Sequence, residues 1–400
     1  CCARPQHERS TTSPLPSPTP SQASHKANAK ISSLMQDIEA NCENALGSLR
    51  RSTFARAIQG SNSIEGYNAT LDDAIAVVEG EQPLDEGTET AFAIKGYRDA
   101  LTYIGQASQD PYFEFSKQFL KSLHFMMLGH DISKNPGQWR PGSVAVVNQR
   151  TGETVYEAPD VEMVNPLIEE FVAYLKAGTK EPTIIKAAMA HLNLTMIHPF
   201  RDGNGRMARA IQTLVLAQGS TLHPVFSSIE EWLGRNTEEY YTVLAITGHG
   251  AWNPERDTQT WVRFCLKAHY QQAATLIRRN DEYSRLFDQI TALLASLRLP
   301  DRSSVSLFDT ALGFRLTNSR YRADAEVTEL VASRDLKKIC EAGLLIPIGE
   351  KRGRAYRASP SLAELRARVR MPKPLENPYD LAARRLKKEE TDEEPRLPGL

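Results

Sequence analysis

The segment from His198 to Arg209, which reads HPFRDGNGRMAR, groups residue types that suit phosphate chemistry. It follows one apolar helical run and precedes another, so we expect a loop that leads into a helix N-terminus. Backbone N–H groups there lack intrahelical partners, and the helix dipole favours anions. Gly203 and Gly205 leave room for an anion to approach these amides, and Asn204 between them can donate further hydrogen bonds. The segment therefore predicts a phosphate-binding loop.

The charged residues of the segment add the groups that a nucleotide reaction needs. Arg206 and Arg209 are three residues apart and so share a helix face, where two guanidinium groups suit the oxygens of the β- and γ-phosphates. Asp202 is an oxygen ligand of the kind that Mg²⁺ takes together with phosphates. His198, with a reference pKa of about 6.5, is a candidate general base.

Each of these residues also has an ordinary structural interpretation when taken singly. A histidine at a helix end is more often structural than catalytic, and an arginine pair is usually a solvated face. The combination is different, because a chance match of eight fixed residue types is on the order of 10⁻⁸ at average composition. The constellation therefore favours function.

The whole pattern resembles the signature of the Fic family, H-x-F-x-[D/E]-G-N-G-R-x-x-R, with every fixed position present. The resemblance covers about residues 50 to 285. It implies a protein adenylyltransferase, which moves AMP from ATP to a Ser, Thr or Tyr hydroxyl of a target protein or of itself and releases pyrophosphate. ATP is then the substrate and Mg²⁺ the cofactor.

The same resemblance implies a role for each position of the signature. His198 deprotonates the target hydroxyl, Phe200 anchors the loop in the core, and Asp202 holds Mg²⁺. The remaining positions bind the phosphates of ATP: the amides of Gly203, Asn204 and Gly205 hold the α- and β-phosphates, and the side chains of Arg206 and Arg209 hold the outer ones. Charge stabilisation is then the main catalytic effect.

A second motif lies upstream of the core. The run Ser61-Asn-Ser-Ile-Glu65-Gly66 matches the pattern [S/T]-x-x-x-E-[G/N] of the inhibitory helix that some Fic proteins carry at this place. The resemblance implies that Glu65 pairs with Arg209 in the space of the γ-phosphate and misaligns the bound ATP. A plain helix end is the alternative for a glutamate before a glycine.

Other functions stay open. Fic enzymes can use other donors, and a Fic enzyme that removes AMP would use Glu65 to orient a water molecule. A nucleotide-responsive DNA-binding regulator is an alternative of another class.

Helical spacing dominates the segments that must position these residues. It predicts helices over residues 31–45, 71–78, 91–104, 113–127, 164–177, 184–197 and 261–276. One segment differs: the runs 143–147 and 153–156, on either side of Asn148–Gly152, predict a β-hairpin. Preceded by Gly137-Gln-Trp-Arg140, this hairpin resembles the family's flap. That resemblance implies that Val144, Val146 and Tyr156 dock a target strand opposite His198. A purely structural hairpin is the alternative.

The chain divides by composition into five parts. We predict a mainly α protein, with a Fic-type helical bundle, a β-hairpin flap and a small C-terminal winged-helix domain. The predicted parts are a disordered tail (1–28), an N-terminal helical region with the inhibitory helix (29–112), the catalytic core (113–285), the winged helix (286–365) and a charged tail (366–400).

The predicted winged helix does not identify the kind of partner that it would bind. Residues 328–339 would form the recognition helix, and Lys351, Arg352 and Arg354 the wing tip. These basic groups suit DNA phosphates, but Glu326, Glu329, Asp335, Glu341 and Glu350 dilute the charge. DNA binding, protein contact and homodimer formation are all compatible with this pattern.

Bulk properties place few further limits on function. The formal net charge of −1 gives no overall attraction to nucleic acid or to anionic membranes. Five cysteines without a C-x-x-C pair, and no run of eighteen apolar residues, predict a cytoplasmic protein with reduced thiols. The sequence begins with Cys1-Cys2, for which a lipid anchor is the less expected interpretation. His191 and His198 have no cysteine or carboxylate at zinc-ligand spacing.

Overall fold

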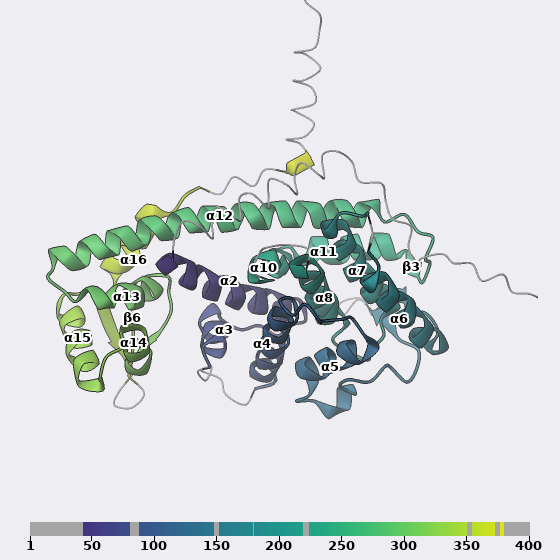
Figure 1. The fold of residues 1–400 in the computed structure, drawn as a ribbon, viewed down its shortest axis with the longest axis horizontal. Coiled ribbons are helices and arrows are strands. Elements are labelled where there is room, and N and C mark those ends of the chain that lie inside the picture. The colour runs from purple at the N-terminus through teal and green to yellow at the C-terminus, as the bar shows by residue number, and fades with distance from the viewer. Residues whose placement is uncertain are drawn as a thin grey trace, which may run out of the picture. The chain divides into compact units, whose positions relative to one another are not determined.

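The computed structural model describes residues 43–80, 88–147, 152–178, 180–218, 224–349, 354–372 and 377–379. The chain divides into two compact units (Figure 1). The first holds residues 95–228 and 233–266, and the second holds residues 27–94, 229–232 and 267–400. The predicted tail at 1–28 and most of the tail at 366–400 lie outside the described residues.

Helices make up most of both units, as predicted. The elements of the first unit are α5 (Lys117–Leu128), η1 (Ile132–Lys134), β1 (Ala145–Val147), β2 (Thr154–Glu157), α6 (Val161–Lys176), α7 (Thr183–Ile197), α8 (Asn204–Gln218), α9 (Pro224–Ser227), α11 (Thr237–Gly248) and β3 (Gly250–Ala251). The elements of the second unit are α2 (Glu43–Ile64), α3 (Leu71–Val78), η2 (Asp301–Ser303), α13 (Ser304–Ala311), β4 (Leu316–Thr317), α14 (Asn318–Ala325), α15 (Glu329–Glu341), β5 (Leu345–Ile348), β6 (Ala355–Ala358) and α16 (Pro360–Val369). The helices α4 (Glu89–Ala107), α10 (Glu230–Arg235) and α12 (Gln259–Ser296) contribute to both units.

The core of the first unit forms around α7 and α8, which pack against each other. Almost every residue of α7 is buried, which explains its predominantly apolar sequence. His191 on α7 is buried, with Nδ1 2.5 Å from Gln212 Oε1 and Nε2 3.0 Å from the Tyr240 hydroxyl. The Trp261 indole N–H donates to the Ala188 carbonyl at 2.7 Å. His191 is thus a satisfied core histidine that joins three helices.

Several predicted helix bounds agree with the structure, and one differs widely. The predicted helix 71–78 coincides with α3, whose N-cap Thr70 accepts from the Asp73 N–H. The predicted helix 261–276 covers only the first half of α12, because Leu286, Ile290 and Leu294 continue the buried stripe. The predicted boundary between residues 285 and 286 therefore falls inside this helix.

The hairpin predicted at 143–156 is present and belongs to a larger sheet. β1 and β2 pair antiparallel, with Val146 opposite Tyr156 and an irregularity between Val146 and Val147. β3 adds to β2 in parallel, so the sheet has three strands where two were expected. This third strand comes from the loop after α11, about a hundred residues away, which local sequence cannot indicate. Residues 148–151 of the predicted turn at 148–152 lie outside the described residues.

The C-terminal region of the second unit combines α13, α14 and α15 with a three-stranded antiparallel sheet in the order β4–β6–β5. The sequence predicts only β5 and β6; β4 is two residues long and pairs with β6. α16 begins at Pro360 after its N-cap Ser359 and continues past the predicted boundary at 365. The winged-helix assignment stays a prediction, and Lys351 and Arg352 of its wing tip lie outside the described residues.

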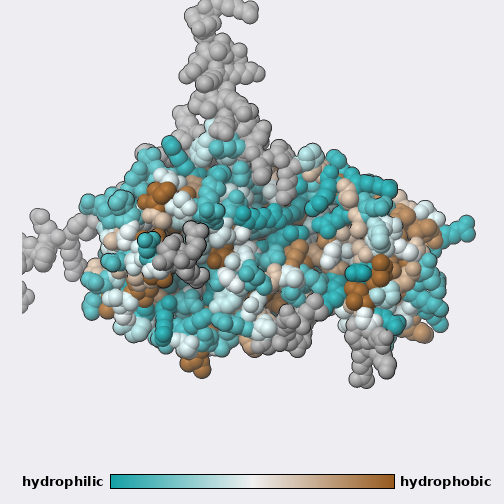
Figure 2. Space-filling view, turned by 180° about the vertical axis from the view of Figure 1, so that it is seen from behind, coloured by the Kyte–Doolittle hydropathy of each residue, from teal (hydrophilic) through white to brown (hydrophobic). Residues whose placement is uncertain are grey.

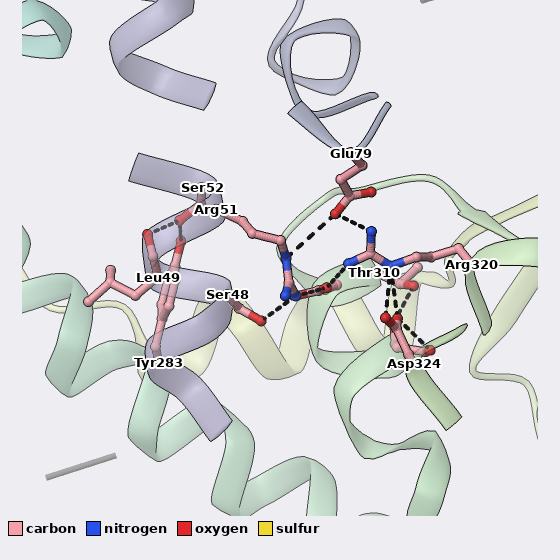
Figure 3. Close-up of polar contacts among 11 residues, drawn as sticks. Ser48, Leu49, Arg51, Ser52, Glu79, Tyr283, Thr310, Arg320 and Asp324 are labelled. Carbon is pink, nitrogen blue, oxygen red and sulfur yellow. Dashed lines mark hydrogen bonds and ion pairs between the residues drawn. The ribbon is translucent and has the colours of Figure 1, made fainter. Parts of the chain in front are cut away.

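A buried ionic network joins α2 to this C-terminal region within the second unit (Figure 3). Arg51 on α2 contacts Asp309 on α13 at 2.6 Å and Glu79 at the end of α3 at 3.5 Å. Arg320 on α14 contacts Glu79 at 2.5 Å, and Ser48 donates to Asp309 at 2.6 Å. Two arginines therefore share two acidic side chains, which allows these charges to be buried together.

The surface shown in Figure 2 is mainly hydrophilic, with separate hydrophobic spots. The large apolar side chains exposed in the described ranges are scattered over many elements, the most exposed being Tyr112, Ile132 and Leu330. Within those ranges, none of the helices combines the length and the apolarity that crossing a bilayer requires.

Candidate active site

His198 ends α7 in an unusual backbone conformation. Its φ is +49°, in the left-handed region that residues other than glycine rarely adopt. Its N–H donates to the Leu194 carbonyl at 3.1 Å, which closes the last turn of the helix. The imidazole is partly exposed, and its Nδ1 lies 3.3 Å from the Thr195 carbonyl. His249 and Glu326 end their helices in the same left-handed conformation, so this backbone geometry is that of a helix C-cap.

Asn204 closes the loop between α7 and α8. Its Oδ1 accepts from the Phe200 N–H at 2.9 Å, and its Nδ2 donates to the Phe200 carbonyl at 2.9 Å. The sequence predicts further hydrogen bonds from this side chain to phosphate. In the structure, both polar atoms of the side chain instead bond to the Phe200 backbone and close the loop. The first residues of α8 are thereby fixed, and the helix begins at Asn204 itself.

A glycine at position 203 suits the backbone conformation there, and it also leaves room for a ligand. Its φ is +76°, and a Cβ at this position would lie 2.7 Å from Cδ1 of Leu128. The positive φ therefore favours glycine, and a Cβ would also require the end of the flexible Leu128 side chain to shift. The predicted phosphate-binding loop thus has a rigid turn directly before the helix N-terminus.

Phe200 is fully buried between two aromatic rings. His124 on α5 stacks on it with the ring centroids 3.7 Å apart, and Trp139 lies 4.9 Å away at a tilt. His124 also bridges two loops: its Nδ1 accepts from the Gly137 N–H at 2.9 Å, and its Nε2 lies 2.9 Å from the Asp202 carbonyl. The first contact places the proton on Nε2, which therefore donates to Asp202.

Asp202 lies among cationic groups. Its Oδ2 is 3.1 Å from Lys134 Nζ, and its Oδ1 accepts from the Gly203 N–H at 2.6 Å. Burial acts to raise the pKa of Asp202, but Arg206, Lys134 and the Gly203 N–H outweigh burial and hold the pKa below its ordinary value. The carboxylate is therefore ionised at neutral pH and can serve as a cation ligand.

Arg206 and Arg209 are both buried on α8, at 0% and 1% exposure. Their burial shows that these two arginines do not form a solvent-exposed face of the helix. They lie in the first two turns of α8, after the loop that Asn204 closes. A buried guanidinium in this position provides a strong, directional partner for a phosphate group.

His124 makes the stability of this site depend on pH. Burial lowers its pKa to about 4, so the ring stays neutral in the folded protein. An unfolded histidine titrates at about 6.5, so the stability is complete above that pH and decreases as the pH falls towards 4. We expect His124 to account for about 2 kcal/mol of the unfolding free energy lost between pH 7 and pH 5.

The measurement is urea denaturation at the two pH values for wild type and His124→Gln. The variant should be less stable at pH 7 and should lose less stability on acidification. An equal loss for both proteins would contradict the prediction.

Two of the three predicted flap residues are partly exposed, and the third is not. Val144 and Val146 are half-buried, whereas Tyr156 is only 6% exposed and donates its hydroxyl hydrogen bond to the Met196 carbonyl at 2.8 Å. The burial of Tyr156 raises the pKa of its phenol. Tyr156 therefore anchors the hairpin to the end of α7, and its side chain does not face outward as the docking prediction required. Val147, which the sequence analysis did not single out, is 50% exposed.

Ser61, Glu65 and Gly66 form the end of α2. Gly66 has φ +86°, its N–H donates to the Ser63 carbonyl at 3.1 Å, and the Tyr67 N–H donates to the Asn62 carbonyl at 3.0 Å. This pair of hydrogen bonds is a Schellman C-cap, which explains the glycine. Ser61 is buried and Glu65 is half-buried. Because Glu65 belongs to the second unit and Arg209 to the first, their pairing stays a prediction.

Four supporting residues were not identified from the sequence as part of the site. They are His124, Lys134, Arg140 and Arg256. Arg140 is buried and hydrogen-bonded to backbone carbonyls, and Arg256 has the same kind of environment in the loop after α11. Only Arg140 carried a sequence signal, because it ends the Gly137–Arg140 run before the hairpin. The others lie on separate elements and meet the site only through the fold.

Comparison with protein families agrees with this geometry. Residues 114–216 match the model of the Fic/DOC family, a span that includes the hairpin and the whole His198–Arg209 segment. Two curated relatives are protein adenylyltransferases named Fic. The one from Nematostella vectensis is 26% identical over 227 residues, 54% of this chain and 47% of the relative. The one from Drosophila grimshawi is 28% identical over 228 residues, 56% of this chain and 43% of the relative. The chain spans about half the length of these relatives or less.

Solved structures show the same fold. A Fic family protein from Desulfovibrio desulfuricans G20 has a TM-score of 0.56 at 20% identity, covering 86% of this chain and 98% of that protein. Residues 134–508 of Fic-1 from C. elegans have a TM-score of 0.51 at 22% identity, covering 64% of this chain and 72% of that one. At these identities the likeness concerns the fold.

Proposed function

Because residues 114–216 carry a Fic/DOC family domain, we propose that this chain is a protein adenylyltransferase that transfers AMP from ATP to a hydroxyl group of a target protein. The observation that carries the proposal is the loop closed by Asn204, which brings His198 to one end and the N-terminus of α8 to the other. The proposed general base and the proposed phosphate-binding end of α8, which begins at Asn204, are six residues apart in the sequence, at the two ends of this loop. The curated relatives with the same activity name support the choice of AMP as the transferred group.

The reaction follows from the chemistry of these groups. The His198 imidazole takes the proton of a Ser, Thr or Tyr hydroxyl, and the oxygen attacks the α-phosphorus of ATP. The bond from the α-phosphorus to the bridging oxygen breaks, and pyrophosphate leaves. The amides at the start of α8, including Gly205, and the guanidinium groups of Arg206 and Arg209 stabilise the charge on the phosphates.

Asp202 is the residue that would hold Mg²⁺. It is ionised, but the described residues contain no group of three or more His, Cys, Asp or Glu side chains suited to a metal. A single carboxylate still fits Mg²⁺, which commonly takes one or two carboxylates and completes its shell with phosphate oxygens and water. When bound, the ion supplies charge neutralisation of the phosphates. Lys134, 3.1 Å from Asp202, would have to move or share the carboxylate.

The edge of the flap sheet is the proposed seat of the target segment. β1 lies at the edge of the sheet, and its outward face carries the exposed Val147. A target strand that pairs with this edge would gain backbone hydrogen bonds. We further propose that Glu65 limits the activity by pairing with Arg209, as the matching inhibitory motif implies.

The test of the transfer is incubation of the chain with heat-inactivated target lysate, Mg²⁺ and ATP labelled at either the α- or the γ-phosphate. The proposal predicts that only the α-label becomes bound to protein. Label from the γ-phosphate alone would indicate a kinase, and no protein label from wild type or Glu65→Gly would overturn the proposal.

A second candidate function, DNA binding, is favoured by the outer face of α15. Arg334, Lys337 and Lys338 are exposed on this helix. Asp335, which dilutes the charge in the sequence, is buried and contacts Arg302 Nε at 2.7 Å, so it does not reduce the charge of that face. The exposed charges of α15 are then Arg334, Lys337 and Lys338 with Glu329 and Glu341, and Lys337 lies 3.7 Å from Glu341.

We expect charge removal on α15 to weaken duplex DNA binding. In the double variant Arg334→Ala/Lys338→Ala, the loss of two phosphate contacts should lower the slope of log K against log salt by about 2. Fluorescence anisotropy with a labelled duplex measures this slope. The matched control is Arg285→Ala/Arg298→Ala, which removes equal charge from α12 and the residues after it. Equal binding by all three proteins would exclude α15 as the contact.

A further inference from the structure

Arg140 makes an unusual set of contacts for an arginine. Its side chain is 2% exposed, and its guanidinium donates to three backbone carbonyls. Nε donates to His198 at 2.9 Å, Nη1 donates to Gly142 at 2.7 Å, and Nη2 donates to Pro159. The backbone N–H of Arg140 also donates to the Pro199 carbonyl at 2.8 Å.

These partners lie on two structural elements that the proposed reaction must bring together. Gly142 precedes β1 and Pro159 follows β2, so they mark the two ends of the flap hairpin. His198 and Pro199 begin the loop that carries the proposed base. The Arg140 side chain therefore links both ends of the hairpin to the backbone of His198, the proposed general base.

Arg140 contacts His198, whose left-handed backbone conformation is unfavourable for a residue with a side chain. A left-handed conformation costs a residue with a side chain roughly 1–2 kcal/mol, so it persists only where its surroundings fix it. The Leu194 carbonyl holds the N–H of His198, and Arg140 Nε holds its carbonyl. The backbone of His198 is thereby fixed on both sides, which sets the direction of its Cα–Cβ bond, and the imidazole Nδ1 lies 3.3 Å from the Thr195 carbonyl.

The chemistry of arginine explains why this residue type is present. A buried cation is unfavourable unless its donors are satisfied, and the planar guanidinium offers donors in fixed directions. Here those directions coincide with three carbonyls from separate segments. A lysine ammonium keeps the charge but, as a point donor on a flexible stem, cannot hold three carbonyls in this arrangement.

We propose that Arg140 is a positioning residue for the transfer reaction, which sets the imidazole of His198 relative to the flap that holds the acceptor hydroxyl. This inference rests on the proposed function, because it assigns the geometry that the general base needs. Arg140 acts through the backbone of His198, since its guanidinium nitrogens donate to backbone carbonyls.

The Arg140→Lys variant separates positioning from binding. We expect kcat for AMP transfer to fall about 100-fold, since a displacement of about 1 Å at the base costs that much. The Kd for ATP should stay within about twofold, because the residues proposed to bind the phosphates are unchanged. The matched control is Arg366→Lys, since Arg366 is partly buried and donates to the backbone carbonyls of Ala311 and Leu312, away from the hairpin and the His198 loop. Its kcat should stay close to that of the parent.

The experiment measures kcat, ATP affinity and thermal stability for both variants, in the more active of the wild-type and Glu65→Gly backgrounds. Hydrogen exchange of residues 141–147, 152–160 and 198–200 is recorded in the same proteins. A selective loss of kcat in Arg140→Lys, with faster exchange in both the hairpin and the loop, supports the proposal. A folded Arg140→Lys protein with unchanged kcat overturns it.

A different set of results would show that the proposed function itself is wrong. In that case neither parent background transfers AMP, and hydrogen exchange alone decides whether Arg140 couples the hairpin to the loop. Faster exchange confined to one of the two segments would then overturn the positioning role. Faster exchange in both segments would support it independently of the reaction.

Discussion

Replacement of His198 by asparagine is expected to lower kcat for AMP transfer by about 10²–10⁴-fold, the usual contribution of a general base. Asparagine tolerates the left-handed backbone that His198 adopts, so the loop should keep its shape. Its amide cannot accept a proton at neutral pH, so only the proton transfer is lost. ATP binding should persist, because the helix end and the two arginines are unchanged.

The measurement is the rate of α-label transfer to protein, together with the Kd for ATP, in wild type, His198→Asn and His198→Ala. The two variants should be equally inactive and should bind ATP alike. The control is His191→Gln, which changes the other α7 histidine in a structural position. That variant should lose stability, and its folded fraction should retain transfer. Substantial transfer by His198→Asn would remove the residue from its proposed role.

Replacement of Glu65 by glycine is expected to raise the rate of AMP transfer at least tenfold. The reason is electrostatic: a carboxylate paired with a phosphate-binding arginine competes with the γ-phosphate. A charge-assisted hydrogen bond contributes about 1.5–3 kcal/mol, and every 1.4 kcal/mol is a factor of about ten. The Schellman cap at Asn62–Tyr67 uses backbone groups, so the helix end should survive the substitution.

Two matched variants separate the carboxylate from the flexibility that glycine brings. Ser63→Gly places a glycine in the same last turn of α2 but leaves Glu65 in place, and it should stay as slow as wild type. Glu65→Gln removes the charge while keeping the shape, and it should be activated in part. If Ser63→Gly were activated as strongly as Glu65→Gly, the effect would be a loosening of the helix end and not the loss of an ion pair.

Local patterns were sufficient to predict the site loop and the helices α3 to α8. The glycines and the asparagine of the His198–Arg209 segment indicated a tight turn before a helix, and α8 begins at Asn204. The apolar run at 184–197 indicated the buried helix α7. These predictions succeeded because the spacing of apolar residues and the backbone freedom of glycine act over a few residues.

The parts that were missed depend on partners that are distant in the sequence. The Asn204 side chain satisfies the Phe200 backbone, although a ligand role was equally compatible with its chemistry. Tyr156 points inward because the Met196 carbonyl and the short strand β3 meet it there. Arg140 is buried because three carbonyls from separate segments converge on it. The Gly137–Arg140 run marked Arg140 as part of the segment before the hairpin, but it did not indicate which carbonyls would surround the side chain.

The most direct test of the proposed activity is the chemical identity of the group that the protein transfers. Glu65→Gly protein is incubated with ATP, Mg²⁺ and target lysate, and the modified peptides are identified by tandem mass spectrometry, with His198→Asn as the blank. The account predicts AMP esterified to a Ser, Thr or Tyr side chain, present with Glu65→Gly and absent with His198→Asn. A bare phosphate, another nucleotide, or adducts that His198→Asn forms equally well would contradict it.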